Sequence, residues 1–166
     1  MLSEVDKRAK YFEIHKAYRS SPEIVEYTNR ILGLHIEPVR MSQGYEVEAR
    51  EFVELNALTI RARFSTLKDE GFERIGIITR NREFADMINA FDLGNEGENV
   101  LIMPVYEAKG LEFDAAIVID TFNSRFEKEM LYTACTRAQH KLIVYKEKTT
   151  RPSGIGGFLG SLFRRN

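Results

Sequence analysis

The sequence predicts an α/β domain of three layers, in which helices cover both faces of a mainly parallel sheet. Two observations support this fold class. Short runs of branched apolar residues alternate along the chain with amphipathic stretches of helical period. Two of these runs, RIGIIT (74–79) and AAIVID (115–120), are apolar on both faces, as strands buried between two layers of helices are.

The same patterns place the individual elements. Strands are expected at 11–14, 74–79, 100–105, 115–120 and 141–145, and helices at 22–32, 46–70, 82–91 and 128–138. The first helix has the clearest limits, because Ser21 and Pro22 are typical of a helix start and Gly33 of a helix end. A polar turn is expected at 95–99.

Length and composition predict one domain, residues 1–150, followed by a tail. Of the 166 residues, 43% are hydrophobic, which is enough to form a core. Residues 151–166 are rich in glycine, serine and arginine, and we expect them to be flexible. A single cysteine, Cys135, allows neither an internal disulfide nor a zinc cluster, and this favours a cytoplasmic location. Because the net charge is -1, nucleic-acid binding would require a local basic patch.

The sequence lacks the motifs of an independent catalyst. It contains no G-x-x-x-x-G-K-[ST] phosphate-binding loop, and the glycine cluster at 154–157 lacks the lysine and hydroxyl residue that such a loop requires. No adjacent acidic pair ends a strand in the manner of a magnesium site, and the three histidines are scattered. We therefore expect no metal site and no enzymatic activity from the chain alone.

Ligands of parallel α/β folds bind beyond the carboxyl ends of the strands, so candidate residues are expected there and at the helix end near Arg137. Tyr18 and Arg19 lie at a strand-to-helix junction, where they could stack on a base and reach a phosphate. Lys109 and Gly110 form a turn between two strands, and Arg137 lies among small residues. Each segment alone is explained equally well or better as a surface arginine, a β-turn or a helix terminus.

The three segments together resemble, in the same order, motifs IV, V and VI of the UvrD/Rep-like superfamily 1 helicases. The matching strings are AYRS (17–20), YEAKGLEF (106–113) and TRA (136–138), and the longer strings AKGLEFD and YTACTRA are highly specific. Ala17 and Tyr106 replace an asparagine and a histidine of the family. Both replacements resemble the branch of HelD and helicase IV. The stretch between motifs IV and V is too short for the large subdomain that UvrD and Rep insert there.

This resemblance implies a RecA-like domain that lacks the P-loop and is the second of two domains that close on ATP. The upstream domain would carry the P-loop, the Mg²⁺ ligands and the catalytic base. In the present chain, Tyr18 would stack on the adenine, and Glu112 would bind near the ribose, with Gly110 in the same nucleotide-binding set. Arg19 and Arg137 would reach the γ-phosphate as the catalytic arginines.

The resemblance also implies a track for single-stranded DNA, which the isolated chain would bind weakly. Tyr106 and Lys109 of motif V would face this track and couple it to the ATP cleft. Thr79 and Arg80, which end another strand, could join it, although a solvated loop explains them about as well.

Two other functions are compatible with parts of the sequence. HelD-like factors are associated with RNA polymerase, so the domain could be a non-catalytic module that contacts RNA polymerase or another protein. A Rossmann-type nucleotide-binding enzyme is less well supported, because no G-x-G-x-x-G follows a strand.

Overall fold

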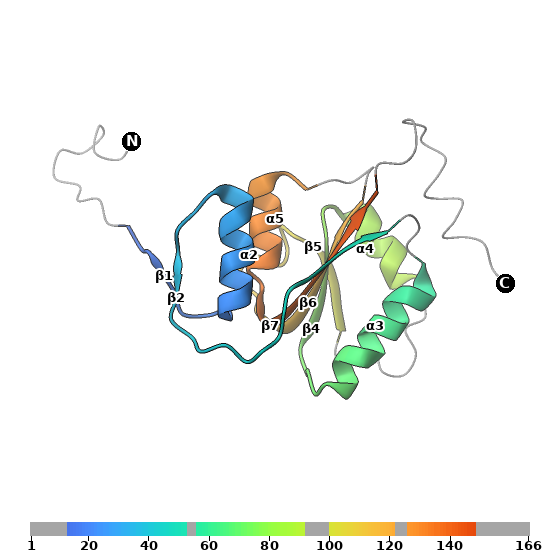
Figure 1. Ribbon diagram of the computed structural model, residues 1–166. Coiled ribbons are helices and arrows are strands. Elements are labelled where there is room, and N and C mark those ends of the chain that lie inside the picture. The colour runs from blue at the N-terminus through green and yellow to red at the C-terminus, as the bar shows by residue number, and fades with distance from the viewer. Residues whose placement is uncertain (1–12, 53–55, 92–99, 122–125, 149–166) are drawn as a thin grey trace.

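A parallel sheet of five strands forms the centre of the fold, in the order β3-β7-β6-β4-β5 (Figure 1). The computed structural model describes residues 13–52, 56–91, 100–121 and 126–148. The strands are β3 (Glu48–Phe52), β4 (Ile75–Thr79), β5 (Val100–Pro104), β6 (Phe113–Asp120) and β7 (Ala138–Glu147). The predicted α/β class with a mainly parallel sheet is confirmed.

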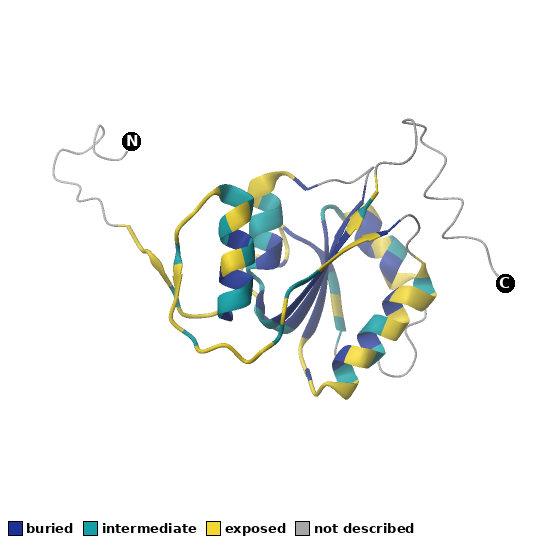
Figure 2. Ribbon diagram, in the orientation of Figure 1, coloured by how far each residue is buried: buried dark blue, intermediate teal, exposed yellow. Residues whose placement is uncertain are grey.

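Helices cover both faces of this sheet. Helices α2 (Pro22–Leu32) and α5 (Lys128–Cys135) pack on one face, and α3 (Ala57–Asp69) and α4 (Arg82–Asn89) pack on the other (Figure 1). Side chains alternate between the two faces along a strand. Accordingly, Ile77 contributes to the core beneath α3 and α4, and Ile78 to the core beneath α2 and α5. Figure 2 shows the buried strands between helices whose outer faces are exposed.

The first helix begins and ends where the sequence predicts. Pro22 is its first residue, and Gly33 follows it in the left-handed conformation, with φ of 66°. The predicted strands at 74–79, 100–105 and 115–120 also agree with β4, β5 and β6 to within two residues. The predicted helix at 128–138 ends earlier, at Cys135, because Ala138 already pairs with Phe113 as the first residue of β7.

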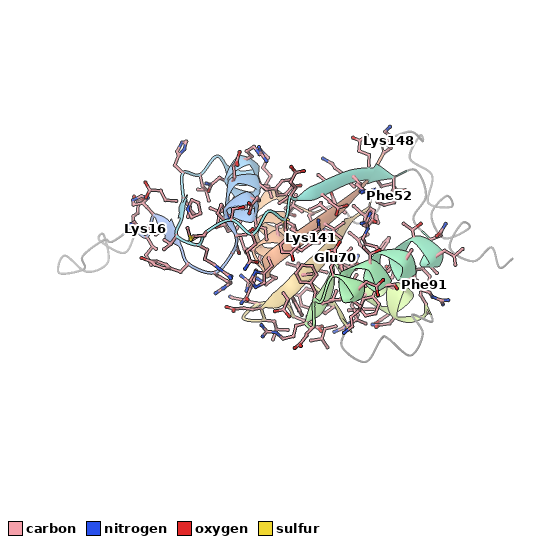
Figure 3. The ribbon with its side chains drawn as sticks, turned by 60° about the horizontal axis from the view of Figure 1, so that its bottom comes forward. Lys16, Phe52, Glu70, Phe91, Lys141 and Lys148 are labelled. Carbon is pink, nitrogen blue, oxygen red and sulfur yellow. The ribbon has the colours of Figure 1, made fainter. Side chains whose placement is uncertain are left out.

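The predicted helix at 46–70 is wrong in its first part. Residues 48–52 form β3, an edge strand that pairs with β7, and α3 begins only at Ala57, where the Asn56 side chain accepts a hydrogen bond from Thr59 N at 2.9 Å. One of the charges that suggested a helix is partnered across the sheet. Glu48 lies 2.8 Å from Lys141 Nζ on β7, which Figure 3 labels. Charged side chains are common on edge strands.

Residues 11–12 of the first predicted strand, at 11–14, lie outside the described residues, and residues 13–14 form no strand; a strand begins at Lys16 instead. The strand is β1 (Lys16–Ala17), which pairs in parallel with β2 (Glu37–Pro38) to form a separate two-stranded sheet beside α2 (Figure 1). Its position is set by backbone hydrogen bonds from Glu37 N to His15 O (2.7 Å) and from Val39 N to Ala17 O (2.9 Å). Such long-range partners leave no local pattern in the sequence.

Some predictions concern residues that the structure does not describe. The predicted turn at 95–99 and the predicted tail at 151–166 lie outside the described residues, so both stay predictions. Among the helices in the described ranges, none is long and apolar enough to cross a membrane.

Candidate functional site

Glu112 and Arg137 are brought together by the pairing of β6 with β7. Phe113 and Ala138 are register partners at the amino ends of these strands, and Phe113 N donates to Arg137 O at 2.9 Å. Glu112 and Arg137 immediately precede the two paired residues, so they are neighbours. This places them at the amino edge of the sheet, so the expectation of a position at the carboxyl ends of the strands is wrong for Glu112, whereas Arg137 follows the end of α5 as expected.

The turn that carries Tyr18 and Arg19 is attached to the same edge. The Ser20 hydroxyl donates to Ala138 O at 2.7 Å, and Ser21 N donates to Gln139 O at 2.8 Å. Both serines are buried. The turn is therefore fixed to the first two residues of β7, and the segments predicted as motifs IV and VI lie against each other although they are far apart in the sequence.

Two arginines and one carboxylate form the charged part of this cluster. Arg19 Nε lies 2.6 Å from Glu112 Oε1, in a pair that is partly exposed on both sides. Burial and the nearby charge of Arg19 lower the pKa of Arg137, while Glu112 acts in the opposite direction. Two guanidinium groups thus share one counter-ion. An anion that bound between the arginines would relieve their repulsion.

The end of α5 fixes the direction of the Arg137 side chain. Arg137 Nε donates to Thr133 O at 3.1 Å, and Nη1 donates to Leu111 O at 3.4 Å. The small residues Ala134 and Cys135 are fully buried, which lets α5 pack closely on the sheet. The sequence YTACTRA therefore places Arg137, with its long cationic side chain, at the end of a tightly packed helix.

A pocket of about 290 Å³ opens between these segments. Its lining includes Tyr18, Arg19, Tyr132 and Arg137, so it combines aromatic rings with both guanidinium groups. The Tyr18 side chain is 68% exposed, and its ring is therefore free to meet a ligand. Glu112 contacts Arg19 of this pocket and also lines a neighbouring hollow of about 440 Å³ together with Gly110 and others.

Of the residues predicted to bind nucleic acid, Thr79, Arg80 and Tyr106 lie at the opposite, carboxyl edge. Val105 N donates to Thr79 O at 2.8 Å, which brings the segment after β4 beside the segment after β5. Tyr106 is 58% exposed, and the Arg80 side chain is partly exposed, 3.9 Å from Glu127. Thr79 is fully buried, and its hydroxyl donates to Asn81 O at 2.8 Å, so its side chain does not reach the surface.

Residues 105–112 connect the two edges. The segment leaves β5 at the carboxyl edge, near Tyr106, and reaches β6 at the amino edge, directly after Glu112. Lys109 is exposed on the turn between them. Gly110 has a φ of 89°, in the left-handed region, and this turn therefore favours glycine. Among the described residues, no group of three or more His, Cys, Asp or Glu side chains could hold a metal ion.

One protein-family model matches part of the chain. Residues 99–145 match the model of the UvrD-like helicase C-terminal domain. This stretch is therefore similar to that family. It spans the strings YEAKGLEF and TRA, and thus both Glu112 and Arg137, whereas the AYRS string lies outside it. No curated protein matches the chain.

A similarity to a solved structure extends over more of the chain. Among 47 matching chains is the C-terminal domain of a possible DNA helicase from Lactobacillus plantarum WCFS1. The two are 25% identical with a TM-score of 0.62, and the similarity covers 82% of this chain and 91% of that one. The assignment to the branch of HelD and helicase IV stays a prediction.

Sequence reasoning missed two residues that hold this cluster together. Arg40 Nη1 donates to Arg19 O at 2.6 Å, and Gln139 Nε2 donates to Glu112 Oε2 at 2.6 Å. Arg40 follows β2 in the small sheet and gives no local signal. Gln139 is two residues after Arg137, and its place on β7 could have indicated that its side chain lies at the same edge.

Proposed function

We propose that this chain is the second RecA-like motor domain of an ATP-dependent DNA helicase or translocase. It completes an ATP site whose P-loop and Mg²⁺ ligands belong to an upstream domain. The observation that carries the proposal is the sharing of one pocket by Arg19 and Arg137, with Glu112 as their nearby carboxylate. The name of the similar Lactobacillus plantarum protein, a possible DNA helicase, supports it.

The residues of the pocket suit the parts of ATP. The guanidinium groups of Arg19 and Arg137 would neutralise charge on the γ-phosphoryl oxygens, which grows as the phosphoryl group is transferred. The exposed ring of Tyr18 would stack on the adenine. Glu112, held beside Arg19, would accept a hydrogen bond from the ribose. Mg²⁺ would be held by the P-loop domain and would supply further positive charge to the phosphates.

The carboxyl edge would contact single-stranded DNA. Tyr106 offers an exposed aromatic ring for stacking, and Arg80 at this edge and Lys109 on the turn that leads away from it offer charges for phosphates. Because residues 105–112 run from this edge to Glu112 at the other, a shift of the segment at the DNA would be transmitted to the ATP cluster. This continuous segment is the physical basis that we propose for coupling.

We expect Tyr18→Ala to raise the KM for ATP about tenfold in the complete helicase, meaning this domain together with its P-loop domain. Stacking on a base contributes roughly 1–3 kcal/mol, and it is similar in the ground and transition states, so kcat should change much less. Tyr18→Phe, which keeps the ring, should stay close to the wild type. Steady-state ATPase kinetics with single-stranded DNA present would measure both constants. An unchanged KM in Tyr18→Ala would exclude adenine stacking by this residue.

We expect the 166-residue chain to bind single-stranded DNA weakly and without sequence preference, with affinity that falls as salt is raised. A few phosphate contacts on a chain of net charge -1 would give this behaviour. Fluorescence anisotropy with two unrelated oligonucleotides would measure it. Lys109→Ala should weaken binding to both, whereas Lys16→Ala, on β1, should not. Tight binding to one sequence only, or no effect of salt, would contradict the proposed track.

A further inference from the structure

Gln139 connects the three segments of the charged cluster. It is the second residue of β7, and its backbone carbonyl accepts a hydrogen bond from Ser21 N at 2.8 Å, at the start of α2. Its side-chain amide donates to Glu112 Oε2 at 2.6 Å. Glu112 Oε1, the other oxygen of the same carboxylate, lies 2.6 Å from Arg19 Nε. A chain of contacts therefore runs from the backbone of β7 through Gln139 and Glu112 to Arg19.

The pair of Arg19 and Glu112 has little rigidity of its own. Their side chains are 44% and 37% exposed, and partly exposed ion pairs between flexible side chains contribute little energy and hold no single geometry. Gln139, by contrast, is held by the backbone at the start of β7, where Ala138 pairs with Phe113 of β6 and the Gln139 carbonyl accepts a hydrogen bond from Ser21 N. Its amide donor is therefore the element that fixes the direction of the carboxylate.

We propose that Gln139 is a positioning residue of the ATP site. It holds Glu112 in the orientation that pairs with Arg19, and Glu112 in turn presents the Arg19 guanidinium to the pocket. This inference rests on the proposed function, because the purpose of the alignment is to meet a phosphate. A glutamine suits the task, since it donates a hydrogen bond without adding a third positive charge beside Arg19 and Arg137, which already repel each other.

Kinetics of the complete helicase test whether Gln139 acts through Arg19. Gln139→Met keeps the length of the side chain and removes the donor, and we expect it to lower kcat for ATP about tenfold, the effect of one hydrogen bond to a charged group, with a smaller change in KM. Gln43→Met, at an exposed glutamine, is the matched control and should be neutral. In an Arg19→Ala background, Gln139→Met should have no further effect. A loss of the same size in both backgrounds would show a general structural role and overturn the proposal.

Nuclear magnetic resonance on the 166-residue chain tests the contact without ATP. The Nε–H signal of Arg19 should be protected from solvent exchange in the wild type and lose that protection in Gln139→Met, while Gln43→Met leaves it unchanged. If protection is unaffected in Gln139→Met, Gln139 does not position Arg19. If protection is lost but Arg19→Ala and Arg137→Ala leave ATP turnover of the complete helicase intact, the contact stands, the proposed function fails, and with it the role of Gln139 in an ATP site.

Discussion

Replacing Arg137 with alanine is expected to lower kcat for ATP in the complete helicase by about a hundredfold or more, with a much smaller change in KM. Charge spreads over the γ-phosphoryl oxygens mainly in the transition state, so a guanidinium that touches them contributes most at that point. The structure adds a reason for the sensitivity of this residue. Its side chain is directed by hydrogen bonds to Thr133 O and Leu111 O, so it enters the pocket in one defined direction.

Two companion variants make this prediction specific. Arg137→Lys should restore little activity, because an ammonium group on a flexible stem lacks the planar fork that binds two oxygens. Arg30→Ala should be neutral, since Arg30 is an exposed arginine on α2 whose partner is Glu26 of the same helix, at 3.3 Å. Thermal melting should show that Arg137→Ala remains folded. Near-normal kcat in Arg137→Ala would mean that the cluster is not part of an ATP site, and a module that contacts RNA polymerase or another protein would then be the better explanation.

Gly76→Ala is expected to cause the largest loss of stability from a single added methyl group. A Cβ atom at Gly76 would lie 2.6–2.7 Å from three atoms of the Phe113 ring, closer than carbon atoms approach in proteins. The ring cannot easily move away, because Phe113 is 2% exposed and packs in the core beneath α2 and α5. Overpacking of a filled core costs roughly 1–3 kcal/mol.

Urea unfolding of the 166-residue chain would measure this loss. The matched test is Phe113→Leu, which removes ring atoms that meet the new Cβ. In the Gly76→Ala, Phe113→Leu double variant, the loss of unfolding free energy should be smaller than the sum of the losses in the two single variants. The reason is that the smaller leucine removes part of the clash with the new Cβ atom. Wild-type stability in Gly76→Ala, or strict additivity in the double variant, would refute the steric account. The contact also matters for the site, because Phe113 directly follows Glu112 and its backbone N–H binds Arg137 O.

The parts of the fold that could be predicted from the sequence are those with local causes. Pro22 and Gly33 limit α2 through their own backbone preferences, and the run IGIIT is apolar enough to be recognised as a strand buried on both faces. β3 could not be predicted, because its charges resemble those of a helix surface. The partner of Glu48, Lys141, is far away in the sequence and is brought near only by the sheet.

In the candidate site, too, the residues that could be predicted are those marked by local sequence. Tyr18, Arg19, Glu112 and Arg137 lie in short strings with a family resemblance, and the structure brings all four to one edge of the domain. Which edge they occupy depends on the register of Phe113 with Ala138, which no local pattern encodes. Gln139 and Arg40 could not be identified from the sequence for the same reason, since each acts only through the residue that the fold places beside it. Thr79 was selected for its position at a strand end, but its burial depends on packing that a sequence pattern does not show.

The most direct test of the central claim is a structure of the complete helicase with ADP, Mg²⁺ and aluminium fluoride, which imitates the phosphoryl group during transfer. We predict that the guanidinium groups of Arg19 and Arg137 lie within hydrogen-bonding distance of the fluoride ligands, about 2.7–3.2 Å, with the nucleotide between this domain and the P-loop domain. A structure in which both arginines point away from the nucleotide and bind only protein groups would contradict the account.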